Sequence, residues 1–142
     1  MSVNGYSYKV KMVKEKLGTK PYYNYNSNQF SAFDIPGIIE SLKKEQNWTR
    51  GELNFAILLK SPSVQVLLTI VHGGTEIVSY QANDSATYQV LKGSLILHIK
   101  NESIVLCEGE LLTIDEKIKY SFDSIEETAF LLTLVSEKEN AR

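Results

Sequence analysis

The pattern that most restricts the fold is a series of short apolar, β-branched runs that begins after Leu53 and is interrupted by turn-forming residues. Turn signals such as Lys-Ser-Pro-Ser, His-Gly-Gly-Thr and Lys-Gly separate the runs. Short strands at roughly 8–12-residue spacing are typical of an all-β sandwich or barrel. Residues 95–107 further predict a hairpin that turns at Asn101-Glu102. The predicted strands are Phe55–Leu59, Val64–Val71, Glu76–Tyr80, Thr87–Leu91, Leu95–Ile99, Ile104–Cys107, Leu111–Ile114, Tyr120–Phe122 and Phe130–Val135.

One segment ahead of these strands has a helical period instead. Asp34 is able to accept from the free amides of a first helical turn, and Pro36 suits a helix start. The following apolar residues are spaced as one face of a helix, and they are Ile35, Ile38, Ile39 and Leu42. The sequence therefore predicts a single short helix over residues 34–46 that packs on the β domain.

Composition limits the class of protein. A chain of 142 residues suits one domain, and its net charge of −2 gives no general attraction to nucleic acid or anionic membrane. One cysteine excludes an internal disulfide framework, and two histidines leave few metal ligands. No apolar run approaches the ~20 residues of a membrane span, and the first residues lack the apolar core of a secretion signal. We therefore expect a cytoplasmic protein without membrane contact.

Charge is unevenly distributed along the chain. Residues 1–20 hold five lysines and one glutamate, a net +4, so residues 21–142 carry −6. This basic, tyrosine-containing arm resembles a single-strand binder in composition, but it is short and has no recognised RNA-binding motif, so we expect no nucleic-acid partner. We expect the arm and loop of residues 1–33 to pack on the acidic body of the same chain or of a partner subunit. Residues 137–142 are predicted to form a solvated tail.

Two glycine-containing motifs carry a resemblance to a known family. Tyr88-Gln-Val-Leu-Lys-Gly resembles the "YVLEG" strand and turn of the cupin superfamily, and residues 107–122 resemble its second motif. Gly93 and Gly109 enclose 15 residues, which suits the hairpin between the two cupin motifs. The chain thus resembles a small single-domain, RmlC-like cupin. The resemblance implies a mainly β fold, a jelly-roll β-barrel over residues 47–136, preceded by the basic arm and one short α-helix.

The resemblance does not extend to the metal-binding positions of that family. Counting back from Gly93 places the glutamate slot at Ala86 and the histidine slots at Ser79 and Gln81, or at Tyr80 and Ala82. Counting forward from Gly109 places the last histidine slot at Tyr120. None of these residues is a histidine or a carboxylate, which iron, manganese or zinc would need. We therefore predict degenerate metal motifs, no metal and no cofactor.

Tyrosines at the vacated positions allow two interpretations. Tyr80 and Tyr120 are able to donate hydrogen bonds to a small polar ligand, with Gln81 and Tyr88 as further pocket residues. Alternatively, the rings fill the interior that a metal would have occupied, as side chains must in a small barrel. No catalytic residue is assigned.

Two other reactive residue types are placed by strand alternation. His98 falls on the mixed face of its strand, which predicts solvent or a subunit interface and not a catalytic base. Cys107 ends a strand beside Glu108, and we expect a buried, inert thiol there.

The sequence leaves two classes of function open, and whether the chain is an enzyme stays undecided, with a non-catalytic role favoured. The first class is a metal-free cupin that serves as a small-molecule-binding or structural module. The alternative is a metal-independent isomerase or lyase on a small sugar- or carbonyl-type substrate, with Tyr80 and Tyr120 as proton donors. A homodimer is expected, because an exposed sheet edge needs a cover. The sequence does not indicate a ligand or a pathway.

Overall fold

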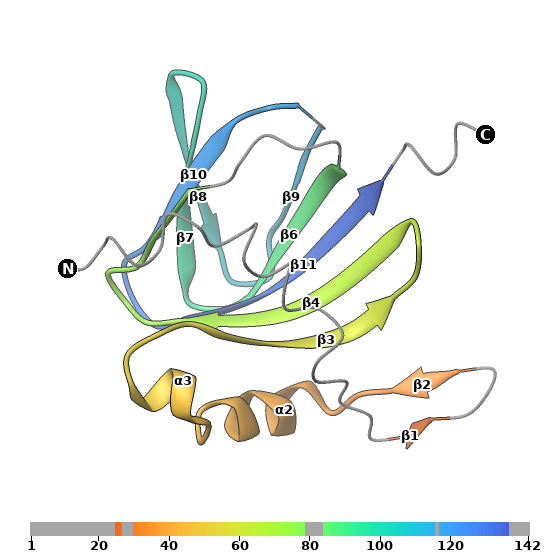
Figure 1. Ribbon diagram of the computed structural model, residues 1–142. Coiled ribbons are helices and arrows are strands. Elements are labelled where there is room, and N and C mark those ends of the chain that lie inside the picture. The colour runs from red at the N-terminus through yellow and green to blue at the C-terminus, as the bar shows by residue number, and fades with distance from the viewer. Residues whose placement is uncertain (1–24, 27–29, 79–83, 116, 137–142) are drawn as a thin grey trace.

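The computed structural model describes residues 25–26, 30–78, 84–115 and 117–136, and its barrel strands form two antiparallel sheets (Figure 1). All nine predicted strands are present in them; the end of the predicted Glu76–Tyr80 run lies outside the described residues. The five-stranded sheet has the order β3 (Asn54–Lys60), β4 (Val64–Val71), β11 (Thr128–Ser136), β6 (Asp84–Lys92) and β9 (Leu111–Ile114). The four-stranded sheet has the order β5 (Glu76–Val78), β10 (Tyr120–Ser124), β7 (Ser94–Ile99) and β8 (Glu102–Cys107).

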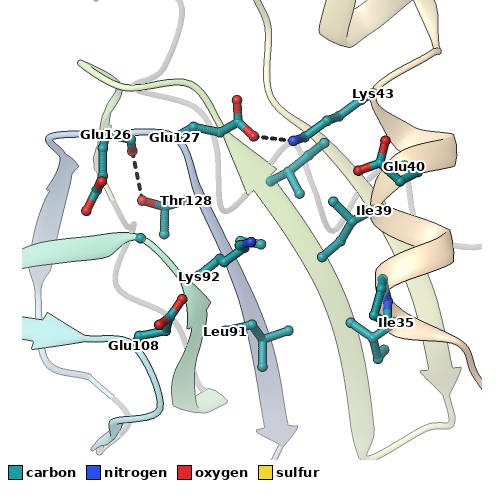
Figure 2. A pocket seen from close by; sticks show the side chains of 14 residues that line it. Ile35, Ile39, Glu40, Lys43, Leu91, Lys92, Glu108, Glu126, Glu127 and Thr128 are labelled. Atoms are coloured by element: carbon teal, nitrogen blue, oxygen red, sulfur yellow. Dashed lines mark hydrogen bonds and ion pairs between the residues drawn. The ribbon is translucent and has the colours of Figure 1, made fainter.

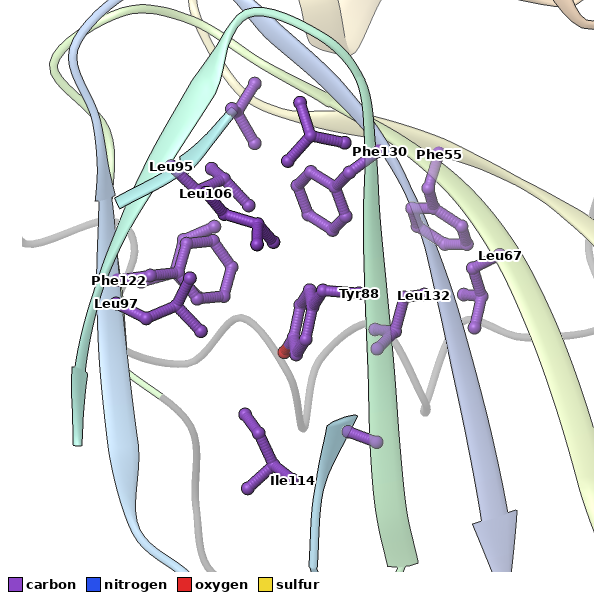
Figure 3. Packing of buried hydrophobic residues seen from close by; sticks show 14 of the residues in the cluster. Phe55, Leu67, Tyr88, Leu95, Leu97, Leu106, Ile114, Phe122, Phe130 and Leu132 are labelled. Carbon is purple, nitrogen blue, oxygen red and sulfur yellow. The ribbon is translucent and has the colours of Figure 1, made fainter. Parts of the chain in front are cut away.

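The main core lies between the two sheets (Figure 3). Burial alternates along β6 and β7, as expected for strands with one face on a core. Large apolar side chains fill this space, among them Leu67, Tyr88, Leu95, Leu97, Phe122, Phe130 and Leu132. The predicted mainly β barrel is therefore confirmed.

The outer face of the five-stranded sheet is covered by two helices, α2 (Ile35–Leu42) and α3 (Gln46–Thr49). Ile38, Leu42 and Trp48 pack against sheet residues that include Ala56 and Leu68. Because both faces of β3 are covered, residues 54–57 are buried without alternation. The predicted helix is confirmed over α2, but it ends at Leu42 and not at residue 46. The extended backbone of Glu45 separates it from α3, a second helix that was not predicted.

Side chains fix both ends of α2. The Asp34 carboxylate accepts from the Gly37 amide at 3.2 Å, as the sequence predicted. At the other end, the buried Asn54 Nδ2 donates to the Leu42 carbonyl and to the Glu45 carboxylate, each at 3.0 Å. The Leu42 carbonyl, which also accepts from the Glu45 backbone amide at 3.2 Å, is thereby bonded to β3. This contact adds to the packing of Ile38 and Leu42 that holds α2 on the sheet.

Several local expectations were wrong or untested. The predicted arm and loop of residues 1–33 contain a short strand pair, β1 (Tyr25–Asn26) and β2 (Ser31–Ala32). The β7–β8 hairpin turns at Lys100–Asn101, one residue earlier than predicted. Cys107 is exposed and not buried, because it is on the outer side of an edge strand. The basic arm and the tail lie outside the described residues.

No helix in the described part of the chain has both the length and the apolar character needed to cross a membrane.

Gly93 makes the β6–β7 turn where only a residue without a side chain fits. Its φ is +87°, and an added Cβ would lie against Thr128 Oγ1 and 2.5 Å from the Glu127 carbonyl oxygen. Gly74 has a similar φ of +83°, but nothing lies within 4 Å of an added Cβ there. Replacing Gly74 would therefore cost backbone strain alone, whereas replacing Gly93 would add steric overlap.

We expect Gly74→Ala to lower the free energy of unfolding by about 1–2 kcal/mol, the cost of a left-handed backbone. Gly93→Ala should cost that amount plus about 1–3 kcal/mol from overlap. Equilibrium urea unfolding of both variants measures the difference. Equal losses would contradict the role assigned to Thr128 and the Glu127 carbonyl.

Candidate functional site

Tyr88 and Tyr120 meet inside the barrel. The resemblance to cupins implies that a ligand site would lie in this interior. Tyr88 comes from β6 and Tyr120 from the start of β10, so the two sheets contribute one residue each. Their hydroxyl oxygens are 2.7 Å apart, and the rings meet edge to face. Tyr88 is 0% exposed and Tyr120 is 9% exposed. The two hydroxyls are thus hydrogen-bonded to each other, and that of Tyr88 is withdrawn from solvent.

Further aromatic rings surround Tyr88 (Figure 3). Its ring centroid lies 5.3 Å from that of Phe122 and 5.6 Å from that of Phe130. The Phe122 and Phe130 rings contact each other at 5.7 Å, edge to face. These separations are in the favourable range for aromatic pairs, so the cluster fills this level of the interior with packed side chains.

Burial raises the pKa of the Tyr88 hydroxyl well above its usual value, and the adjacent Tyr120 raises it further. The charged form would lose hydration without gaining a positive partner. Tyr88 therefore stays neutral at physiological pH. A hydroxyl with a raised pKa is also a weaker acid, which makes Tyr88 less suited to general acid catalysis.

The family slots that can be located point into the barrel. Ala86, at the glutamate slot, and Tyr120, at the last histidine slot, are both buried in the main core. Lys117 stands where the second motif has glycine, and its φ of +68° is the left-handed conformation that glycine favours. Tyr80 and Gln81 lie outside the described residues, as do Ser79 and Ala82.

The described residues contain no group of three or more His, Cys, Asp or Glu side chains that could hold a metal ion. The two located slots, an alanine and a tyrosine, offer no carboxylate or imidazole. This part of the chain therefore lacks the donor set that a resident iron, manganese or zinc ion requires.

One polar atom inside the barrel was not singled out by the sequence. Gln65 Oε1 is buried and has no hydrogen-bond partner within the described residues. Gln65 pairs with Leu134, which in turn pairs with Ala86, so the amide lies in the same cross-sheet row as the glutamate slot. A strand amide between apolar neighbours gives no signal in a single sequence, because its direction depends on the register.

A cavity of about 590 Å³ lies at the tip of the β7–β8 hairpin, beside the end of β9. Its apolar lining is Ile99, Ile104, Ile114 and Ile118, and its rim holds Lys100, Glu102 and Asp115. Ile99 and Ile118 also pack on the main core. The floor of this cavity is therefore formed by side chains at the edge of the main core.

A larger groove of about 770 Å³ runs beside α2 (Figure 2). Ile39, Leu91 and other apolar side chains form its floor, and Lys43 makes an ion pair with Glu127 across its rim. The remaining charged residues of the lining are Glu40, Lys92, Glu108 and Glu126. The sequence did not predict this site, because its residues come from a helix, three strands and three turns that meet only in the folded chain.

The outer face of the four-stranded sheet carries a hydrogen-bonded row of three polar side chains. His98 Nδ1 lies 3.0 Å from Ser103 Oγ, and His98 Nε2 lies 3.0 Å from Asp123 Oδ2. A neutral imidazole fits this arrangement when Nε2–H donates to the carboxylate and Nδ1 accepts from the hydroxyl. The His98 and Asp123 side chains are each 40% exposed, on the predicted outer face.

This row resembles a catalytic triad only in composition. None of the three residues lines either cavity described above. Acyl transfer also needs donors aimed at a developing oxyanion in a site that excludes water, which an exposed sheet face does not supply. The row is better explained as cross-strand bonding that joins β8, β7 and β10.

Comparisons with solved structures support the fold. No protein-family model matches the chain, and no curated protein matches it. Among solved structures, the EutQ protein of Clostridium difficile is similar at a TM-score of 0.63 and 17% identity, over 80% of this chain and 85% of that chain.

Two proteins of Shewanella frigidimarina are similar as well. A cupin-2 domain protein matches at a TM-score of 0.59 and 17% identity, over 72% of this chain and 92% of that chain. An RmlC-like cupin matches at a TM-score of 0.57 and 15% identity, over 65% of this chain and 83% of that chain. At these identities the likeness concerns the fold alone, and the chain has the jelly-roll barrel fold of the cupin superfamily.

Proposed function

We propose that this chain is a metal-free, non-catalytic cupin-fold module that contacts other molecules through its outer surface and not through the centre of its barrel. One observation carries the proposal: the Tyr88 hydroxyl is wholly buried and bonded to that of Tyr120 within an aromatic cluster. A ligand at this level would have to displace packed rings. The groove beside α2 is a surface site that could make such contacts.

A second candidate is a small polar ligand, or a metal-independent isomerase or lyase substrate, at the Gln65 end of the barrel. The buried Gln65 Oε1 without a partner supports it, since an unsatisfied buried acceptor costs about 1–3 kcal/mol that a ligand donor would recover. The raised pKa of Tyr88 argues against that residue as the acid. The module is therefore the preferred candidate.

We further propose a cytoplasmic homodimer that forms through a free sheet edge. Val105 and Leu111, each 56% exposed, lie on the edge strands β8 and β9. Exposed apolar residues on an unpaired edge favour association, because both the apolar surface and the free backbone groups gain a cover. An exposed free Cys107 suits a reducing compartment.

Metal and ligand content of the full chain, purified without a histidine tag, tests both parts of this proposal. We expect elemental analysis to find no stoichiometric metal, and native mass spectrometry to find two chains with no retained small molecule. Stoichiometric metal would overturn the metal-free module. A retained molecule of defined mass would favour the second candidate, and a single-chain mass at micromolar concentration would exclude the homodimer.

A double-mutant cycle tests whether the tyrosine pair has a purely structural role. Tyr120→Phe leaves the buried Tyr88 hydroxyl without this bond, and it should lower the free energy of unfolding by about 1–3 kcal/mol. Tyr88→Phe should cost about 1 kcal/mol, because Tyr120 keeps some exposure to solvent. The double Phe variant should be more stable than Tyr120→Phe alone. If the losses of the two single variants add up to the loss of the double variant in urea unfolding, the bond between the two hydroxyls is contradicted.

The raised pKa of Tyr88 also predicts a loss of stability at alkaline pH. Above about pH 10 the unfolded chain releases the Tyr88 proton, whereas the folded chain retains it. Folding is therefore penalised increasingly as the pH rises from there toward the folded-state pKa. The difference in free energy of unfolding between wild type and Tyr88→Phe should shrink from pH 9 to 11. A constant difference would mean that Tyr88 is solvated.

A further inference from the structure

The groove beside α2 has an acidic rim. Four carboxylates and two ammonium groups line it, so its net charge is −2. Lys43 is paired with Glu127, and the Ser94 hydroxyl donates to Glu126 at 3.3 Å. Glu40 and Glu108 have no ion pair within the described residues. A basic occupant would therefore find carboxylates on both sides of the groove, from the helix and from the turns of the barrel (Figure 2).

The floor of the same groove is apolar. Ile70 and Ala129 are buried there, and the α2 residue Ile39 and the β6 residue Leu91 remain half-buried. Apolar side chains laid on this floor would remove further apolar surface from water. The groove thus combines features that suit a segment with alternating apolar and basic residues.

The chain itself contains such a segment. Residues 8–12 read Tyr-Lys-Val-Lys-Met, within an arm whose residues 1–20 carry a net +4. In an extended conformation, alternate side chains point to opposite sides, so Tyr8, Val10 and Met12 share one side and the lysines the other. The twenty residues after Met12 lead to Phe33 and the start of α2, whose Ile35 already lines the groove. At about 3.3 Å per residue, that length is ample for an intramolecular contact.

We propose that residues 8–12 of the same chain occupy the groove beside α2, with the apolar side chains on its floor and Lys9 and Lys11 near Glu108 and Glu126. The inference rests on the proposed outer-surface role of this fold. The same chain is favoured over a second copy because a tethered segment has a high effective concentration.

The single cysteine provides a direct test on the full chain. Cys107 is exposed and immediately precedes the groove residue Glu108. A nitroxide spin label on Cys107 should broaden the backbone amide signals of residues 8–12 in NMR spectra. The double charge reversal Glu108→Lys/Glu126→Lys should abolish that broadening. Glu76→Lys, an exposed change on the other sheet, should leave it unchanged and serves as the matched control.

Mixing distinguishes the occupants. In a mixture of spin-labelled chains and isotope-labelled Cys107→Ser chains, we expect no broadening between chains. Broadening in that mixture would overturn the same-chain assignment in favour of a second copy. No broadening of residues 8–12 in either sample, or broadening that persists after the double charge reversal, would overturn the docking itself. Neither result would alter the metal and ligand content that tests the proposed function.

Discussion

The fold depends on filling the space between two curved sheets, and Tyr88 is at the centre of that solution. Its ring contacts Phe122, Phe130 and Tyr120, so residues from β6, β10 and β11 meet around one side chain. A tyrosine in such a place needs a partner for its hydroxyl, and Tyr120 provides one from the opposite sheet. The interior at this level is thereby filled with packed side chains. This packing is the reason for proposing contacts at the surface, where α2 and the barrel turns form a charged groove.

Much of the fold could be predicted because strands leave a local signal. Alternating apolar residues and intervening turns located the nine barrel strands, and Asp34 with Pro36 located the helix start. β1 and α3, with two and four residues, lie among polar residues and show no period of their own. Cys107 was misplaced because an apolar strand end does not reveal which face it takes; its neighbour Leu106 is buried and Cys107 points outward.

The site was predictable only in part, because its geometry depends on contacts between distant segments. Family spacing placed the glutamate slot at Ala86 and the last histidine slot at Tyr120, and both residues are buried in the main core. The bond between Tyr120 and Tyr88 joins residues 32 positions apart, and no local pattern announces it. The groove beside α2 and the row of Ser103, His98 and Asp123 arise in the same way, from strand order and register. The predicted pocket residues Tyr80 and Gln81 lie outside the described part of the chain.

The place of β11 in its sheet has a consequence for the order of assembly. β11, the final described strand, lies between β4 and β6, so the last part of the barrel to be synthesised must enter between strands made much earlier. The hairpins β3–β4 and β7–β8 can form as soon as their own residues are available, but the five-stranded sheet cannot close before Ser136 exists. Pairings between such distant segments are slow to form. During translation, β4 and β6 therefore present open edges, and this interval is when the nascent chain is most exposed to aggregation.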